Sequence, residues 1–142
     1  MPASGSGPEV LVDTSVAVAL TVADHADHEA TFQAIGDRRL GLAGHAAFET
    51  FSVLTRLPPP ARRTPSTVAR VLAASFPDSR YLSTEATASL LAELEGAGIA
   101  GGSVYDALVG AVAREHGVAL ATRDRRALET YHRLDVKVEL VR

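Results

Sequence analysis

The stretch EVLVDTS, residues 9–15, joins a short apolar run to an abrupt series of polar side chains. The run Val10–Val12 predicts a short strand that is buried on both faces, as the strands of parallel sheets are. Asp13 follows at the carboxyl end of this strand, just before an apolar segment typical of a helix. Because ligands of open α/β folds bind at that edge of the sheet, Asp13 is a candidate site residue. The simpler interpretation is that Asp13 or Thr14 caps the following helix.

Short apolar runs alternate with segments of helical periodicity along the rest of the chain. Further strands are predicted at residues 40–43, 80–82, 118–121 and 136–141, with helices between them. The three prolines of residues 58–60 end one helix, and Pro65 stands near the first position of the next. Strands separated by helices imply a parallel sheet covered on both faces. We therefore expect an α/β fold: a three-layer α/β/α domain with a central, mainly parallel sheet of about four to five strands.

The composition narrows the class of protein. The chain has 142 residues, enough for one domain with a real core, which we expect at residues 9–142 after a flexible Gly-, Ser- and Pro-rich tail at residues 1–8. The net charge of −3 supplies no global basic field, so nucleic-acid binding requires a local patch. No apolar run is long enough for a membrane span, and the absence of cysteine excludes disulfides, thiol nucleophiles and Cys-based zinc sites. These features favour a cytoplasmic protein without a membrane partner.

Three further carboxylates stand at positions that suit a site. Asp106 lies in the first turn of its predicted helix, where Ser103-x-x-Asp106 also matches a capping box. Asp124 follows the predicted strand 118–121, at a helix start that favours an acidic residue in any case. Glu49 falls on a narrow polar strip of a mid-chain helix, between two apolar faces. A solvated Glu near Arg56 would explain that position equally well.

The four carboxylates are expected to share one location. Asp13 and Asp124 follow strands of the same parallel sheet, and a right-handed crossover can bring the helix start with Asp106 to the same edge. Carboxylates that converge repel one another unless a cation neutralises them. Oxygen donors without Cys or paired His favour Mg²⁺ or Mn²⁺ over zinc. Such a site suits metal-assisted phosphoryl chemistry.

The order of these motifs resembles the PIN-domain nuclease family. The motifs are Val12–Ser15, Glu49 in a mid-chain helix, Tyr105–Leu108 and Thr122–Asp124. More narrowly, the chain resembles the VapC-type ribonuclease toxins of bacterial toxin–antitoxin pairs, and the resemblance covers essentially everything after residue 8. Each motif is short, but four in this order at suitable spacing are fairly specific.

The resemblance implies a metal-dependent endoribonuclease that hydrolyses phosphodiester bonds of structured RNA such as tRNA or rRNA. It also implies a homodimer that is inhibited by a cognate antitoxin, and Mg²⁺ or Mn²⁺ as cofactor. The implied metal ligands and catalytic residues are the acidic ones: Asp13 and Asp106 directly, with Glu49 and Asp124 completing the site. The implied supporting residues, which hold carboxylates or a water in place, are Thr14, Ser15 and Thr122.

Basic residues surround the last carboxylate. Many relatives carry another acidic or polar residue soon after it, whereas Arg125 and Arg126 follow Asp124 here. Arg123 and Arg125 are candidate RNA contacts, because phosphate would approach a nuclease site there. The alternative interpretation is that these arginines are ordinary charged residues of the solvated surface. Aromatic residues make up only 5% of the chain, and no exposed aromatic stripe for base stacking is evident from the sequence.

Other classes of protein account for less of the pattern. A receiver-type phospho-acceptor domain normally needs a lysine beside its Mg²⁺ site, and the only lysine, Lys137, lies in the last predicted strand. A haloacid-dehalogenase-like phosphatase needs a second Asp two residues after the first, where Ser15 stands. A catalytically silent PIN-fold protein that only binds a partner stays open as an alternative, and it would bind metal without turnover.

Overall fold

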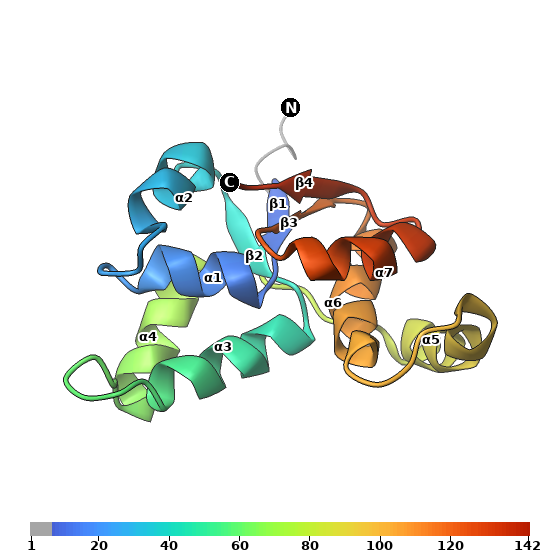
Figure 1. The fold of residues 1–142 in the computed structure, drawn as a ribbon, viewed down its shortest axis with the longest axis horizontal. Helices are drawn as coiled ribbons and strands as arrows, with labels where there is room; N and C mark the ends of the chain where they lie inside the picture. Colours follow the sequence, from blue (N-terminus) through green and yellow to red (C-terminus); the bar gives the residue numbers. More distant parts are fainter. Residues whose placement is uncertain (1–6) are drawn as a thin grey trace.

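The computed structural model describes residues 7–142, so most of the tail expected at residues 1–8 lies outside the described residues. Figure 1 shows the arrangement of the elements. In chain order they are β1 (Val10–Val12), α1 (Thr14–Thr21), α2 (His28–Ile35), β2 (Leu40–Leu42), α3 (His45–Thr55), α4 (Pro65–Ser75), α5 (Thr84–Ala97), α6 (Ser103–His116), β3 (Ala119–Thr122), the 3₁₀ turn η2 (Arg125–Ala127), α7 (Leu128–Arg133) and β4 (Val138–Leu140).

Four parallel strands form one sheet in the order β2-β1-β3-β4. The first strand is central, with Leu11 opposite Gly41 of β2 on one side and opposite Leu120 of β3 on the other. This position explains why all three residues of β1 are apolar and fully buried. The α/β fold with a mainly parallel sheet of about four strands is confirmed.

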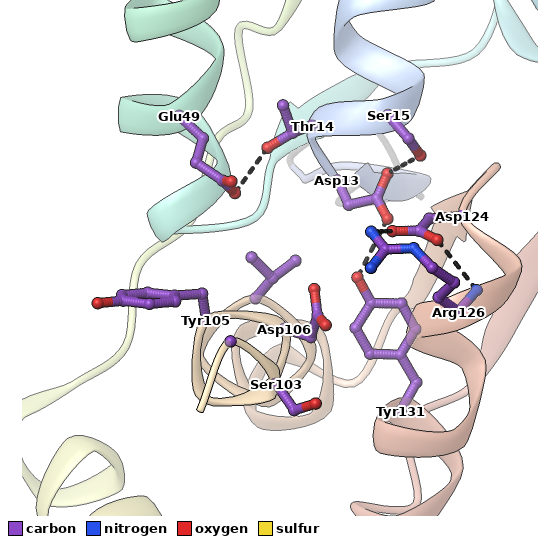
Figure 2. Close-up of a pocket in the computed structure, with 12 residues that line it drawn as sticks. Asp13, Thr14, Ser15, Glu49, Ser103, Tyr105, Asp106, Asp124, Arg126 and Tyr131 are labelled. Carbon is purple, nitrogen blue, oxygen red and sulfur yellow. Dashed lines mark hydrogen bonds and ion pairs between the residues drawn. The ribbon is translucent and has the colours of Figure 1, made fainter. Parts of the chain in front are cut away.

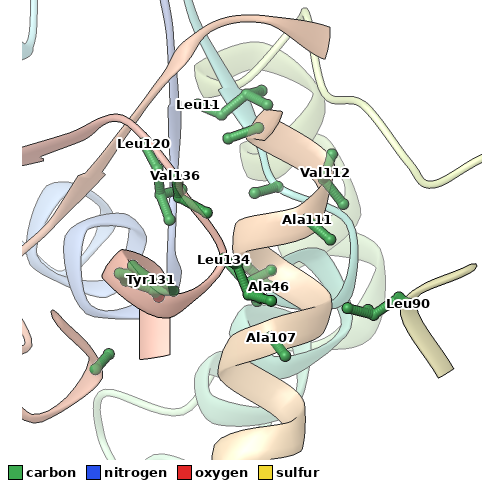
Figure 3. Packing of buried hydrophobic residues seen from close by; sticks show 14 of the residues in the cluster. Leu11, Ala46, Leu90, Ala107, Ala111, Val112, Leu120, Tyr131, Leu134 and Val136 are labelled. Carbon is green, nitrogen blue, oxygen red and sulfur yellow. The ribbon is translucent and has the colours of Figure 1, made fainter. Parts of the chain in front are cut away.

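Helices cover both faces of the sheet. Because alternate residues of a strand point to opposite faces, Val10 and Val12 pack with buried residues of α1, α2 and β2. Leu11 and Leu120 pack on the other face, against α6 and α7. Figure 3 shows this second cluster, in which α6 runs alongside Tyr131, Leu134 and Leu120. The three-layer α/β/α arrangement follows from these two cores.

The strand expected at residues 80–82 is wrong. Arg80 makes a single parallel bridge to Ala43, in which the Arg80 N–H donates to the Leu42 carbonyl at 3.1 Å. The chain then leaves the sheet, because Ser83 caps α5 and accepts a hydrogen bond from the Ala86 N–H at 3.0 Å. One bridged pair is therefore all that this segment adds beside β2.

Helix boundaries follow the local signals closely. Pro65 opens α4, and the Thr64 hydroxyl caps it by accepting from the Thr67 N–H at 3.2 Å. Gly98 and Gly117, both with φ of +68°, end α5 and α6 in the left-handed conformation that glycine adopts easily. The helix expected at residues 124–133 begins as the 3₁₀ turn η2 before it becomes α7. None of the helices formed by residues 7–142 has the length and apolar character needed to cross a bilayer.

Candidate active site

A cavity of about 560 Å³ lies where β1 and β3 end and α6 begins. Figure 2 shows the four carboxylates arranged around it. The residues that line it are Asp13, Thr14, Ser15, Glu49, Gly102, Ser103, Tyr105, Asp106, Val109, Asp124, Arg126 and Tyr131. The structure thus brings together all four carboxylates that the sequence places at the edge of the sheet.

Asp13 is the most deeply buried of the four, with 5% of its surface exposed. One carboxylate oxygen accepts from the Ser15 hydroxyl at 2.6 Å and from the Val16 N–H at 3.3 Å. The other oxygen accepts from the Tyr131 hydroxyl at 3.0 Å. Burial raises the pKa of Asp13, and these hydrogen bonds oppose the rise. Asp13 is therefore both the N-cap of α1 and a member of the cavity wall, so the two interpretations of this residue are compatible.

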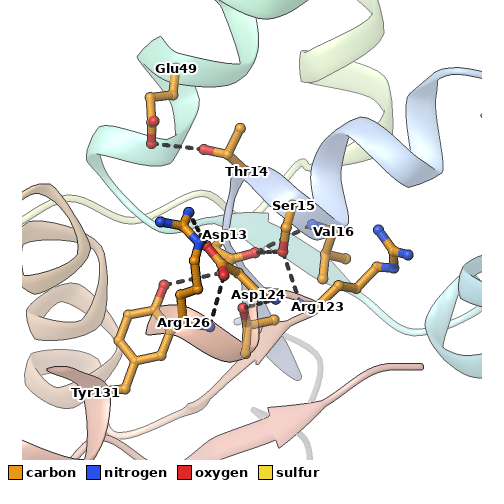
Figure 4. Close-up of polar contacts among 10 residues, drawn as sticks. Asp13, Thr14, Ser15, Val16, Glu49, Arg123, Asp124, Arg126 and Tyr131 are labelled. Carbon is orange, nitrogen blue, oxygen red and sulfur yellow. Dashed lines mark hydrogen bonds and ion pairs between the residues drawn. The ribbon is translucent and has the colours of Figure 1, made fainter. Parts of the chain in front are cut away.

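Two hydroxyl groups fix the ends of the central strands relative to Asp13, and Figure 4 shows the first of them, that of Ser15. Ser15 donates to Asp13 and accepts from the Arg123 N–H at 2.9 Å, which ties the start of α1 to the end of β3. Thr122 is fully buried, accepts from the Asp124 N–H at 3.0 Å, and hydrogen-bonds to Asp13. A buried hydroxyl needs such partners, so both side chains serve the placement of the carboxylates.

Asp106 stands in the first turn of α6, and its capping-box interpretation is wrong. The N-cap of α6 is Gly102, and no side-chain hydrogen bond forms at this cap. The Asp106 carboxyl instead faces the cavity, as Figure 2 shows. Burial, together with the charges of the neighbouring carboxylates, Asp124 foremost, raises its pKa to about 6. The positive charge of Arg126 therefore offsets only part of the cost of ionising Asp106.

The other two carboxylates line the cavity and also hydrogen-bond to neighbouring residues. Glu49, an exposed residue, accepts from the Thr14 hydroxyl at 2.9 Å. Arg56, the neighbour expected if Glu49 were merely solvated, donates to the Ser52 hydroxyl at 3.3 Å. Asp124 accepts from the backbone N–H of Arg126 at 3.0 Å and from its guanidinium at 3.1 Å.

The chemistry of the donors fits a hard divalent cation, because the cavity is lined with carboxylate and hydroxyl oxygens. The arrangement of these donors is not yet that of a metal site. Within residues 7–142, no group of three or more His, Asp or Glu side chains is arranged to hold a metal ion. Glu49 faces Thr14 and Asp124 faces Arg126. Both side chains also line the cavity, so a site made by all four carboxylates includes two that already hydrogen-bond to protein donors.

The arginines around Asp124 lie at different distances from the cavity, and the RNA contacts expected for Arg123 and Arg125 stay a prediction. Arg123 forms an ion pair with Asp27, and its side chain is only 18% exposed and does not line the cavity. Arg125 is exposed in η2 and is also absent from the cavity wall. Arg126, which sequence reasoning did not select, lines the cavity with 90% of its side chain exposed.

Tyr131 is the second residue that sequence reasoning missed. Its ring is almost completely buried in the core beside α6, and its hydroxyl reaches Asp13. Burial, followed by the charge of Asp13, raises its pKa, so the hydroxyl remains a donor. A buried Tyr needs a partner for its hydroxyl, and Tyr131 lies on the helix that follows the last motif. Its place directly after the last motif could therefore have identified Tyr131 as a candidate site residue.

Comparison with known proteins matches residues 10–133 to the PIN domain family. The chain is 49% identical over 131 residues to ribonuclease VapC40 of Mycobacterium tuberculosis, across 91% of this chain and 96% of that protein. It is 46% identical to ribonuclease VapC27 of the same organism, across 92% and 96%. The crystal structure of VapBC2 from Rickettsia felis, bound to a promoter DNA fragment, has the same fold, with a TM-score of 0.65 at 12% identity over 92% of this chain and 97% of that chain. The chain therefore belongs to the PIN domain family and, within it, to the VapC ribonucleases.

Proposed function

We propose that this protein is a divalent-metal-dependent endoribonuclease, the toxin of a toxin–antitoxin pair, and that the carboxylate cavity is its active site. The observation that carries the proposal is the uncompensated charge of this cavity. Four carboxylates line it, and their mutual repulsion, added to burial, raises the pKa of Asp106 to about 6. A cavity that concentrates negative charge in this way is suited to a cation.

Within this proposal, Asp13 and Asp106 are the direct ligands of Mg²⁺ or Mn²⁺, and Glu49 and Asp124 complete the site. A cation bound there would act as a Lewis acid on the scissile phosphate and on the attacking water. Ser15, Thr122 and Tyr131 hold Asp13 in one orientation through the hydrogen bonds described above. Oriented acceptors of this kind lower the reorganisation that ion binding requires.

Arg126 is the cavity residue best placed to meet the substrate. Its guanidinium is exposed and lies beside Asp124. An exposed ion pair of this kind contributes little to stability, so Arg126 can exchange Asp124 for a phosphate oxygen. That exchange would also free Asp124 for the cation. Arg125, exposed on the same turn, is a second candidate for the RNA backbone, whereas Arg123 would first have to leave Asp27.

The substrate follows from the relatives. VapC40 and VapC27 are ribonucleases that match nearly the whole chain at 46–49% identity. We infer RNA as the substrate here too, and structured RNA such as tRNA or rRNA as its class.

The partner follows from the same comparison and from the charge of the cavity. The Rickettsia felis protein was solved as a VapBC2 complex, which supports a cognate antitoxin for this chain. An inhibitor that brings an Arg or Lys toward Asp13 and Asp106 would neutralise the cavity in place of a cation. A complex whose antitoxin leaves the cavity open would contradict this mode of inhibition.

We also expect a homodimer, which sedimentation velocity can test.

The experiment is RNA cleavage by the purified protein. Wild type should cut a structured RNA with Mg²⁺ or Mn²⁺ and should be inactive in EDTA. Asp106→Asn should lose cleavage while keeping its fold, and Asp24→Asn, at an exposed residue outside the cavity, should cut normally. Undiminished cutting in EDTA would overturn metal dependence. Metal binding without any cutting would favour the alternative, a silent partner-binding protein.

A further inference from the structure

Aromatic side chains gather beside the carboxylate cavity, although they are far apart in the sequence. The rings of His45 and Tyr105 stack with centroids 5.1 Å apart and planes inclined by 24°. Tyr105 lines the carboxylate cavity and is 54% exposed. His45 lines a second hollow of about 230 Å³, together with Phe48 and Tyr81. The stacked pair therefore lies between the carboxylate cavity and a hollow that is lined in part by rings.

The stability of the fold does not explain why these rings are exposed. Phe48 is 68% exposed and Tyr81 is 52% exposed. Single exposed apolar residues are ordinary, but several flat side chains at one place form a patch, and such patches mark binding sites. Figure 2 shows Tyr105 on the Glu49 side of the cavity, with its hydroxyl directed away from Asp106 and Tyr131. The ring, rather than the hydroxyl, is what this residue contributes to the cavity wall.

We propose that the His45–Tyr105 pair is a stacking platform for one unpaired RNA base next to the scissile phosphate. This inference rests on the proposed function, because it assumes that the carboxylate cavity receives the phosphate. Protein contacts to single-stranded RNA are commonly made by stacking bases on aromatic side chains, and every base offers a flat face for this. A platform on the rim of the cavity would select an unpaired nucleotide, since a base inside a duplex has no free face.

The residues near His45 and Tyr105 on their helices support this assignment. His45 and Glu49 are four residues apart on α3, so the platform and a candidate ligand share one helix face. Tyr105 and Asp106 are adjacent at the start of α6. Because Tyr105 lines the same cavity as the carboxylates, a base stacked on its ring lies at the wall of that cavity. The sequence did not predict this surface, because its four rings come from three separate segments.

The experiment measures binding apart from cleavage. Fluorescence anisotropy with labelled single-stranded hexaadenylate, in EDTA and in Ca²⁺, compares wild type with Tyr105→Phe, Tyr105→Leu and Tyr105→Ala. The loss of one base–aromatic stack should weaken binding about 5- to 100-fold in the Leu and Ala variants, and Tyr105→Phe should bind as wild type does. Tyr105→Leu keeps the apolar bulk, so it separates the flat ring from a general packing role.

A matched control exists on the other side of α1. Phe32 is 52% exposed and contacts His28, with ring centroids 6.2 Å apart, but it lies outside the carboxylate cavity. Phe32→Ala should leave hexaadenylate binding unchanged. An abasic hexamer should bind wild type as weakly as hexaadenylate binds Tyr105→Ala.

Three results would overturn the inference: equal binding by Tyr105→Ala and wild type, an equal loss in Tyr105→Phe, or tight binding of the abasic hexamer. Loss of antitoxin binding in Tyr105→Ala with normal binding of hexaadenylate would also overturn it and would assign the patch to a protein partner. Because binding is measured without cleavage, a wild type that binds through Tyr105 but does not cut RNA would refute the proposed function alone.

Discussion

Asp106→Asn removes one negative charge from the cavity with almost no change in side-chain size. Burial and the neighbouring carboxylates raise the pKa of Asp106 from 3.8 to about 6. A pKa difference of one corresponds to about 1.4 kcal/mol, so the charged form would cost about 3 kcal/mol above pH 6 if nothing screened it. Asp106 is only partly buried, and salt screens its neighbours, so the effective cost is about 1–2 kcal/mol.

The substitution also removes a favourable acidic group from the first turn of α6, which costs about 0.5 kcal/mol. The net gain should be about 0.5–1.5 kcal/mol, or roughly 2–5 °C in Tm for a domain of this size. The assay is thermal melting followed by circular dichroism at pH 7.5 in EDTA. Asp24→Asn, at an exposed residue outside the cavity, should melt as wild type does.

The difference should shrink as the pH falls. Because the folded pKa of Asp106 is raised, the folded chain takes up its proton between pH 6 and pH 3.8, ahead of the unfolded chain. Lowering the pH through this window therefore removes the cost from wild type but changes nothing at residue 106 of the variant. Near pH 4 Asp106 is protonated in the folded chain, so the helix-start benefit is lost as well and the two proteins should melt together. A variant that melts below wild type at pH 7.5 in EDTA, by an amount independent of pH, would refute the reasoning.

Mg²⁺ should cancel or reverse the difference at pH 7.5. At ten times its dissociation constant, an ion bound to the folded state adds about 1.4 kcal/mol, or roughly 3–6 °C, to wild type. Asp106→Asn should gain little of this, because it lacks one of the two direct ligands that we propose. An equal gain in both proteins would mean that the ion binds elsewhere.

Two further predictions concern the packing around Tyr131. Tyr131→Phe removes the 3.0 Å hydrogen bond to buried Asp13 and should lower the free energy of unfolding by about 1–3 kcal/mol, measured by urea titration in EDTA; equal midpoints would show that the bond contributes nothing. Gly110→Ala places a Cβ 2.9 Å from the Tyr131 ring and 3.0 Å from Val136, and this overpacking should cost about 1–3 kcal/mol despite alanine's better helix propensity. Gly96→Ala is the control, because no neighbouring atom lies within 4 Å of its added Cβ, and it should raise the free energy of unfolding by up to about 1 kcal/mol. A change of the same sign in both glycine variants would contradict the packing argument.

Local signals in the sequence were sufficient for most of the fold. The apolar run of β1 predicts a buried central strand, and the prolines and glycines predict most helix ends, since each acts on its own backbone. Residues 80–82 failed because a strand depends on pairing as well as on composition. Arg80 meets Ala43 at one position only, and Ser83 then directs the chain into α5.

The candidate site was predictable where it depends on topology. Strand ends and helix starts placed Asp13, Asp106 and Asp124 at one edge of the sheet, and the structure brings them to one cavity. Side-chain partners were not predictable, because they depend on contacts between distant segments. Arg123 binds Asp27, 96 residues away, and Tyr131 reaches Asp13 across 118 residues.

The stacked aromatic pair shows the same limit. Neither His45 nor Tyr105 belongs to an aromatic run, and a composition of 5% aromatic residues suggested that no stacking surface exists. The fold places the starts of α3 and α6 side by side and thereby creates one. Surfaces assembled from separate helix ends in this way leave no periodic trace in the sequence.

The central claim is that the carboxylate cavity binds the cation on which RNA cleavage depends. Titration of Mn²⁺, followed by the loss of its free paramagnetic resonance signal and in parallel by the rate of RNA cleavage, tests this most directly. We predict that both curves share one midpoint in wild type and in Asp24→Asn, and that Asp106→Asn loses binding and cleavage together. Cleavage that reaches its full rate without bound Mn²⁺, or Mn²⁺ binding that Asp106→Asn leaves unchanged, would contradict the account.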